Sequence, residues 1–190
     1  MDTRSIMIVG VGGQGSLLAS RLLGNVLLAQ GYDVKVSEVH GMSQRGGSVV
    51  TYVKYGDEVF SPVIEKGEAD VIISFEQLEA ARWVPYLKKG GKLITSTQKL
   101  DPMPVITGAA EYPENIVEKI KAAGVEVTAV DALGLAEQAG NAKASNVVLM
   151  GKVASQTEFD DKLWQDAIEQ CVPAKFLELN KKAFELGKNA

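Results

Sequence analysis

The sequence has almost no cysteine and almost no histidine. Among its 190 residues there is one cysteine, Cys171, and one histidine, His40. A single cysteine excludes an internal disulfide, and it cannot by itself ligate an iron-sulfur cluster or a structural zinc ion. Redox chemistry that depends on such ligands therefore has to come from another chain.

Long apolar runs and an excess of positive charge are also missing. The longest apolar run, around Val147 to Met150, is far too short to cross a bilayer, and the N-terminus lacks the basic region and apolar core of a signal peptide. The formal net charge is −4 at pH 7 and the pI is about 5.2, whereas nucleic-acid binding normally needs a basic surface. We therefore expect a cytoplasmic protein that contacts neither membrane nor nucleic acid.

The remaining composition is that of one globular domain. A chain of 190 residues with 46% hydrophobic residues is large enough for a single core. It contains no linker, internal repeat or low-complexity tract. Residues 1–190 are predicted to form one domain.

Strand-like and helix-like segments alternate along the first two thirds of the chain. The pattern predicts strands at 5–9, 33–39, 48–54, 70–75, 92–97 and 125–130, with helices at 16–30, 76–89 and 113–123. Three further helices are predicted at 143–155, 159–170 and 173–186. This order predicts a three-layer, Rossmann-like α/β domain with a mostly parallel sheet and a helical C-terminal part.

A glycine-rich turn follows the first predicted strand. Its GxGxxG spacing can aim backbone amides at a phosphate, and an acid at the end of the second strand is placed to meet a ribose hydroxyl. The alternative is that the glycines only allow close packing of strand and helix, and the extra glycine and the glutamine are untypical of hydride-transfer enzymes. The tentative cofactor set is Gly10, Gly12, Gly13, Gln14, Gly15 and Glu38.

A polar loop, "VHGMSQRGG" at 39–47, joins the second and third predicted strands. Open α/β sheets bind ligands in loops at the carboxyl ends of their strands, so the loop is predicted to be a binding site or a subunit contact. For the histidine alone a hydrogen-bonded structural role is the alternative, and for the arginine a surface ion pair. The predicted contact residues are His40, Met42, Ser43, Gln44, Arg45, Gly46 and Gly47.

Four segments together resemble the gamma-type domain of the 2-oxoacid:ferredoxin oxidoreductases. They are "GVGGQG" at 10–15, "SEVHGMSQRGG" at 37–47, "DVIISFEQLEAAR" at 70–82 and "GNAKASNVVLMG" at 140–151. The resemblance covers essentially the whole chain. Family members acting on pyruvate tend to carry a tyrosine and an acid in place of "VHGMSQ", so this loop is similar to that of the indolepyruvate, or arylpyruvate, branch.

The resemblance implies a subunit of an enzyme that decarboxylates a 2-oxoacid on thiamine diphosphate, reduces ferredoxin through [4Fe-4S] clusters and uses coenzyme A as co-substrate. It implies that a large partner subunit carries the thiamine diphosphate and the clusters in a hetero-oligomer, and that Arg45 faces an anionic group of substrate or coenzyme A. No cofactor and no catalytic residue is assigned to this chain, which is expected to be inactive alone. A free-standing NAD- or flavin-binding protein and a nucleotide-binding regulatory module remain the alternatives.

Overall fold

The computed structural model of the protein describes residues 2–39 and 46–190. Six strands form one sheet in the order β2-β3-β1-β4-β5-β6, in which β3 is antiparallel to β1 and β2 while the other neighbours are parallel. The sheet is thus mixed but mostly parallel, which confirms the predicted α/β class. The strands are β1 (Arg4–Val11), β2 (Asp33–Val39), β3 (Ser48–Gly56), β4 (Ala69–Ser74), β5 (Leu87–Ser96) and β6 (Glu126–Val130).

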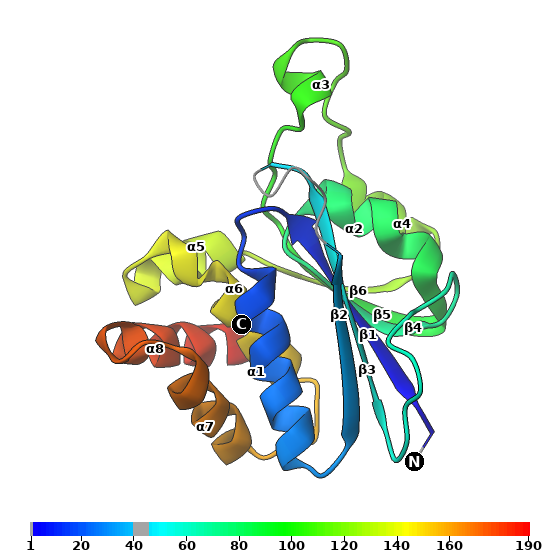
Figure 1. The fold of residues 1–190 in the computed structure, drawn as a ribbon. Coiled ribbons are helices and arrows are strands. Elements are labelled where there is room, and N and C mark those ends of the chain that lie inside the picture. Colours follow the sequence, from blue (N-terminus) through cyan, green and yellow to red (C-terminus); the bar gives the residue numbers. More distant parts are fainter. Residues whose placement is uncertain (1, 40–45) are drawn as a thin grey trace.

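Helices cover both faces of the sheet (Figure 1). One face carries α1 (Ser16–Ala29), α5 (Ala132–Ala139), α6 (Ser145–Ala154), α7 (Asp161–Cys171) and α8 (Leu177–Lys188), and the other carries α2 (Gln77–Trp83) and α4 (Ile116–Ala122). The short helix α3 (Met103–Ile106) stands away from both layers, and single 3₁₀ turns lie at Val84–Tyr86, Ala142–Ala144 and Ala174–Phe176. Within the described residues no helix is long and apolar enough to cross a membrane.

The composition of β1 follows from this double cover. Ile6 and Ile8 point into the core shared with α1 and α6, whereas Met7 and Val9 point into the core shared with α2 and α4. A strand buried on both faces needs apolar side chains at successive positions, which explains the unbroken apolar run rather than an alternating one.

One predicted helix is wrong in its second half. The segment 76–89 was expected to be helical to its end, but α2 stops at Trp83 and β5 already begins at Leu87. Pro85 explains the stop, because proline has no N–H to donate and its ring clashes with the preceding helical turn. The lysines and glycines that follow therefore belong to the start of β5.

The sheet order also departs from a Rossmann fold. β2 and β3 form an antiparallel hairpin, so that β3 lies between β2 and β1. The alternating sequences at 33–39 and 48–54 predict both strands correctly, but alternation carries no information on which strand pairs with which. The polar loop is therefore the connection between the two strands of this hairpin.

The chain changes faces between β1 and β4. The helix after β1 packs on one face of the sheet, and the helix after β4 packs on the other (Figure 1). Such a switch point opens a crevice at the carboxyl ends of the two strands, where open α/β sheets bind ligands. From the same edge residues 99–113 rise above the sheet with α3 at their tip, and we call this segment the arm.

Candidate functional site

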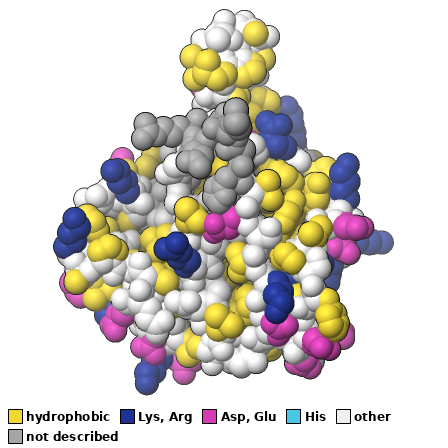
Figure 2. All heavy atoms as spheres, in the orientation of Figure 1, with side chains coloured by type: hydrophobic (Ala, Val, Ile, Leu, Met, Phe, Trp, Pro, Cys, Tyr) yellow, Lys and Arg dark blue, Asp and Glu magenta, His cyan; other side chains and the backbone are white. Residues whose placement is uncertain are grey.

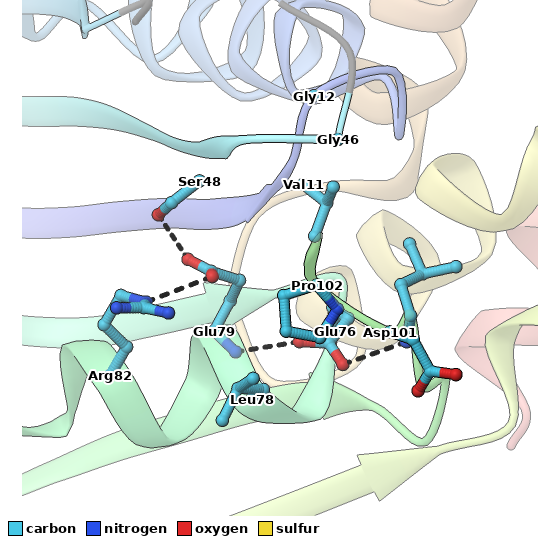
Figure 3. Close-up of a pocket in the computed structure, with 11 residues that line it drawn as sticks. Val11, Gly12, Gly46, Ser48, Glu76, Leu78, Glu79, Arg82, Asp101 and Pro102 are labelled. Atoms are coloured by element: carbon cyan, nitrogen blue, oxygen red, sulfur yellow. Dashed lines mark hydrogen bonds and ion pairs between the residues drawn. The ribbon is translucent and has the colours of Figure 1, made fainter. Parts of the chain in front are cut away.

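A cavity of about 310 Å³ lies at the switch point, between the glycine turn, the first residue of β3, helix α2 and the base of the arm (Figure 3). Its walls thus come from four separate stretches of the sequence. The lining residues are Val11, Gly12, Gly46, Ser48, Glu76, Leu78, Glu79, Arg82, Leu100, Asp101 and Pro102.

Glu76 connects α2 to the arm. Its Oε2 accepts a hydrogen bond of 2.9 Å from the backbone N–H of Glu79 and so caps the first turn of the helix. Its Oε1 accepts a hydrogen bond of 3.2 Å from the N–H of Leu100 and another from the hydroxyl of Tyr112. Leu100 lies near the start of the arm and Tyr112 near its end, so one buried carboxylate holds both ends of the arm.

Tyr112 stays protonated in this position. Burial, together with the hydrogen bond to Glu76, raises the pKa of the Tyr112 phenol well above its usual value. The hydroxyl therefore remains a donor across the physiological pH range and is not a candidate base.

Glu79 connects α2 to the end of the polar loop. One of its oxygens accepts hydrogen bonds from the Ser48 hydroxyl and, at 3.3 Å, from the Trp83 indole N–H, and the other accepts a bond of 3.1 Å from Nε of Arg82. Ser48 is the first residue of β3, directly after the polar loop. Figure 3 shows Ser48, Glu79 and Arg82 converging on one wall of the cavity.

The side chain of Gln14 fills the glycine turn. Its Oε1 accepts a hydrogen bond of 2.7 Å from the N–H of Val11, and its Nε2 donates to the carbonyl of Phe75 at 3.0 Å and to Oε1 of Gln98 at 2.9 Å. A side chain at Gly10 would bring its Cβ within 2.9 Å of Gln14 Oε1, so glycine leaves the room that the glutamine needs. Gln14 thereby ties together the carboxyl ends of β1, β4 and β5.

The end of the polar loop contacts the glycine turn directly. The N–H of Gly12 donates to the carbonyl of Gly47 at 2.8 Å, and the N–H of Gly46 donates to the carbonyl of Gly12 at 3.3 Å. The two motifs singled out in the sequence are therefore hydrogen-bonded to each other. The other five predicted loop contacts lie outside the described residues: His40, Met42, Ser43, Gln44 and Arg45.

The start of α6, which is distant in sequence, packs against the glycine turn. Gly13 and Gly15 have φ angles of 103° and 86°, which only glycine adopts readily. Asn146 in the first turn of α6 donates from Nδ2 to the carbonyl of Gly15 at 3.1 Å, and a Cβ at Gly15 would lie 2.3 Å from that nitrogen. The glycine turn is thus packed against the "GNAKASNVVLMG" segment.

Glu38 has a partner within the chain. Its Oε1 accepts a hydrogen bond of 2.9 Å from the Ser20 hydroxyl in α1, and β3 separates its strand from the glycine turn. In a dinucleotide fold the strand that carries the ribose-binding acid lies beside the first strand. These contacts, with those of Gly12 and Gln14, give the glycines a packing role, and the cofactor site stays a prediction.

The described lining of the cavity is acidic. Glu76, Glu79 and Asp101 outnumber the single guanidinium of Arg82, and the first two carboxylates are already occupied by hydrogen bonds. Across residues 2–39 and 46–190 no three His, Cys, Asp or Glu side chains are grouped to hold a metal ion. An anionic ligand here would need positive charge from outside the described residues.

Cys171 lies elsewhere in the molecule. It is in α7, where Nδ2 of Asn25 in α1 approaches its sulfur to 3.3 Å. Burial raises the pKa of the Cys171 thiol, which disfavours the thiolate that a nucleophile needs. The sulfur has no geometric relation to the cavity.

The sequence analysis did not single out several residues that build this site. An acid directly after a strand and three residues before another acid is a helix-capping signal, and it could have identified the start of α2. The contacts of the arm and of the "GNAKASNVVLMG" segment join residues far apart in the chain and leave no local pattern. The missed residues are Glu76, Glu79, Arg82, Gln98 and Tyr112.

A family model matches almost the whole chain. The model described as pyruvate ferredoxin/flavodoxin oxidoreductase matches residues 5–190. Among curated relatives, the indolepyruvate oxidoreductase subunit IorB of Thermococcus kodakarensis is 44% identical over 197 aligned positions, which cover 100% of this chain and 96% of that protein.

Solved structures with low sequence identity share the fold. Pyruvate oxidoreductase subunit PORC of Thermotoga maritima superposes with a TM-score of 0.76 at 21% identity, covering 100% of this chain and 97% of that one. A 2-oxoglutarate:ferredoxin oxidoreductase from Magnetococcus marinus, whose crystals contain 2-oxoglutarate, coenzyme A and succinyl-CoA, superposes with a TM-score of 0.76 at 17% identity. This chain is covered completely there but spans only 31% of that larger chain.

Proposed function

The chain belongs to the pyruvate ferredoxin/flavodoxin oxidoreductase family, and from that membership we infer how its described surface is used. It is a small subunit of a 2-oxoacid:ferredoxin oxidoreductase. We propose that the substrate is indolepyruvate or a related arylpyruvate. The 44% identity to an indolepyruvate oxidoreductase subunit supports this assignment, as does the "HGMSQRGG" form of the polar loop.

We propose that a large partner subunit carries the thiamine diphosphate and the [4Fe-4S] clusters, with ferredoxin as electron acceptor and coenzyme A as co-substrate. The sequence supports this division of labour, because one cysteine cannot ligate a cluster. Among the described residues of the cavity, the carboxylates of Glu76 and Glu79 are already engaged in hydrogen bonds, which does not favour an acid-base role for either of them.

We propose further that the edge formed by the glycine turn, residues 46–48 and the arm faces this partner. The observation that carries the proposal is that the four segments typical of the family meet at that edge. The N–H of Gly12 donates a hydrogen bond to the carbonyl of Gly47 at 2.8 Å. The "SFEQLEAAR" segment supplies Glu76 and Glu79 to the cavity lining. Asn146 donates a hydrogen bond to the carbonyl of Gly15. No other part of the described surface gathers all four.

The arm extends this surface outward. Met103 and Ile106 at its tip are each 65% exposed, and residues 102–110 contain no charged side chain. Figure 2 shows apolar side chains at the tip of the arm. Interface cores are depleted of charge and enriched in methionine, so the arm has the composition of a docking element.

Hydrogen exchange tests the proposed orientation. The chain would be co-purified with the large subunit, and its amide exchange compared with that of the chain alone. Added protection at 10–15, 46–48 and 99–113 is expected. Protection confined to α7 and α8 on the opposite side of the molecule would contradict the proposed orientation.

A further inference from the structure

A second cavity lies at the opposite end of the sheet. It measures about 500 Å³ and is lined by residues near the amino ends of β1, β4 and β5. Cavities of 300–1,000 Å³ with a mainly apolar lining and a few polar groups are typical of small-molecule sites. Nothing in the function proposed above uses it.

The inner wall of this cavity is apolar and aromatic. Ile6 and Ile94 form part of it with exposed fractions of 6% and 2%. The rings of Tyr32 and Tyr55 stand side by side with centroids 5.3 Å apart and planes tilted by 57°, and Phe159 from the α6–α7 connection lines the cavity as well. A flat, apolar ring system would bury its surface against these groups.

The rim carries more positive than negative charge. Nη1 of Arg4, at 3.1 Å, and Nζ of Lys88 both approach the same oxygen of Asp70, while its other oxygen accepts a hydrogen bond of 2.8 Å from the N–H of Ser5. One carboxylate therefore balances two cations. Lys92 is also on the rim, and its Nζ forms an ion pair of 3.4 Å with Oε1 of Glu126, a residue that does not line the cavity.

Glu158 is the remaining acid of the lining. It lies in the exposed connection between α6 and α7, where solvent screens its charge. Counting all lining residues, Arg4, Lys88 and Lys92 oppose Asp70 and Glu158. Because Glu126 pairs with Lys92, the cations that remain for a ligand are Arg4 and Lys88, which together exceed the Asp70 carboxylate by one positive charge. This excess matches a monoanion better than a polyanion.

We propose that this cavity binds small aromatic carboxylates. The ring of the ligand lies against Tyr32, Tyr55 and the apolar inner wall, and its carboxylate meets Arg4 and Lys88 at the rim. Arginine presents a planar fork of donors that fits a carboxylate, and lysine adds a point charge, so the two cations that share Asp70 can accept a second carboxylate. The proposal is independent of the partner-facing edge.

The sequence offers a matched pair of variants for the test. Lys88 lines the cavity, whereas Lys89, the next residue of β5, does not, although both are lysines in the same exposed stretch of strand. Because Lys88 is 44% exposed, Lys88→Gln is expected to fold normally. Lys89→Gln makes the same change of net charge away from the cavity.

The full chain would be titrated with phenylacetate and indole-3-acetate by isothermal calorimetry and by NMR of amide shifts. Phenylacetamide and acetate serve as a neutral ring and an anion without a ring. We expect saturable binding of the two aromatic carboxylates only, with shifts around Tyr32, Tyr55 and Asp70. Lys88→Gln should weaken binding about tenfold and Lys89→Gln less than twofold.

Three results would overturn the proposal. The first is no saturable binding of either carboxylate to the wild-type chain. The second is equal binding of phenylacetamide, which would show that the cations do not recognise the ligand. The third is equal loss in the two lysine variants, which would show a general effect of net charge rather than a site.

Discussion

Glu76 is the residue on which the helix, the arm and the cavity depend together. It is 1% exposed, and its carboxylate accepts hydrogen bonds from Glu79, Leu100 and Tyr112. A buried group with several partners is costly to remove, because each partner is left without an acceptor.

Glu76→Ala is therefore expected to lower the free energy of unfolding by about 3 kcal/mol, the sum of a lost helix cap and unsatisfied donors. Tyr112→Phe removes only one donor and should cost about 1 kcal/mol. Urea denaturation of both variants measures the difference. Equal losses for the two would contradict the role given to Glu76 at the start of α2.

The glycine turn allows backbone strain and side-chain crowding to be separated. Gly13 and Gly15 both have positive φ angles, but a Cβ at Gly13 would meet nothing within 4 Å, whereas one at Gly15 would meet Asn146 at 2.3 Å. Gly13→Ala should cost about 1 kcal/mol of stability from strain alone. Gly15→Ala should cost clearly more, and adding Asn146→Ala should recover part of the excess.

Thermal or urea unfolding of Gly13→Ala, Gly15→Ala and the double variant Gly15→Ala with Asn146→Ala measures these losses of stability and the recovery. If Gly15→Ala costs no more than Gly13→Ala, Asn146 does not pack against the turn as described. The same result would weaken the view that these glycines serve packing, and dinucleotide titrations of the chain would then be the next step.

Asp70 gives the protein a predictable response to acid. Burial opposes ionisation of Asp70, but hydrogen bonds from Lys88, the Ser5 N–H and Arg4 outweigh it and hold the pKa of this carboxyl below its ordinary value. A lowered folded-state pKa gives stability that is fully present above the unfolded pKa of about 3.9 and is lost as pH falls through the folded value.

Asp70→Asn should therefore be less stable than wild type near pH 6 but lose less further stability between pH 4 and pH 2.5. Urea unfolding at a series of pH values measures both slopes. Parallel curves for the two proteins would show that Asp70 does not titrate with a shifted pKa.

At the scale of elements, the local sequence pattern predicted the helices and strands better than it predicted which of them contact one another. β2 was predicted at its observed bounds, and α1 within one residue at its C-terminus, because glycines and alternating residues mark them locally. The false continuation of α2 arose where helix-forming lysines follow Pro85, and there the strand pairing of β5 with β4 overrides local propensity. α5, with the sequence ALGLAEQA, was not predicted.

The site was predictable only in part for the same reason. The glycine turn and the polar loop are compact motifs, so the sequence identifies them. The contact of Gln14 with Gln98 spans 84 positions and that of Asn146 with Gly15 spans 131, and a single sequence shows no sign of either.

The arm is the element whose proposed role is easiest to isolate. Met103→Ser with Ile106→Ser removes exposed apolar side chains at its tip, so stability of the chain should change by less than about 0.5 kcal/mol. Association with the large subunit should weaken at least tenfold if the tip is buried in the interface. Co-purification and biosensor titration measure this effect.

Phe60→Ser with Val63→Ser is the matched control. These two side chains are 86% and 54% exposed in the connection between β3 and β4, at the other end of the sheet. Their replacement should leave association unchanged. A larger effect of the control than of the arm variant would place the partner on the wrong side of the molecule for our proposal.

At the scale of the whole molecule, the features fit a subunit better than a free enzyme. The cavity at the switch point has an acidic described lining, and the carboxylates of Glu76 and Glu79 are held in internal hydrogen bonds. The chain matches a single family model from residue 5 to residue 190, and in the larger Magnetococcus chain a similar fold is one portion of a longer polypeptide. A small subunit that completes a larger one would need a shaped edge rather than chemistry of its own.

The most direct test of this account is an activity measurement on assembled and separate subunits. Coenzyme A-dependent reduction of a viologen dye would be followed with indolepyruvate, phenylpyruvate and pyruvate, using this chain alone, the large thiamine diphosphate and iron-sulfur subunit alone, and the co-purified pair. We predict turnover by the pair only, with arylpyruvates preferred to pyruvate. Full activity of the large subunit without this chain, or no association between the two, would contradict the central claim.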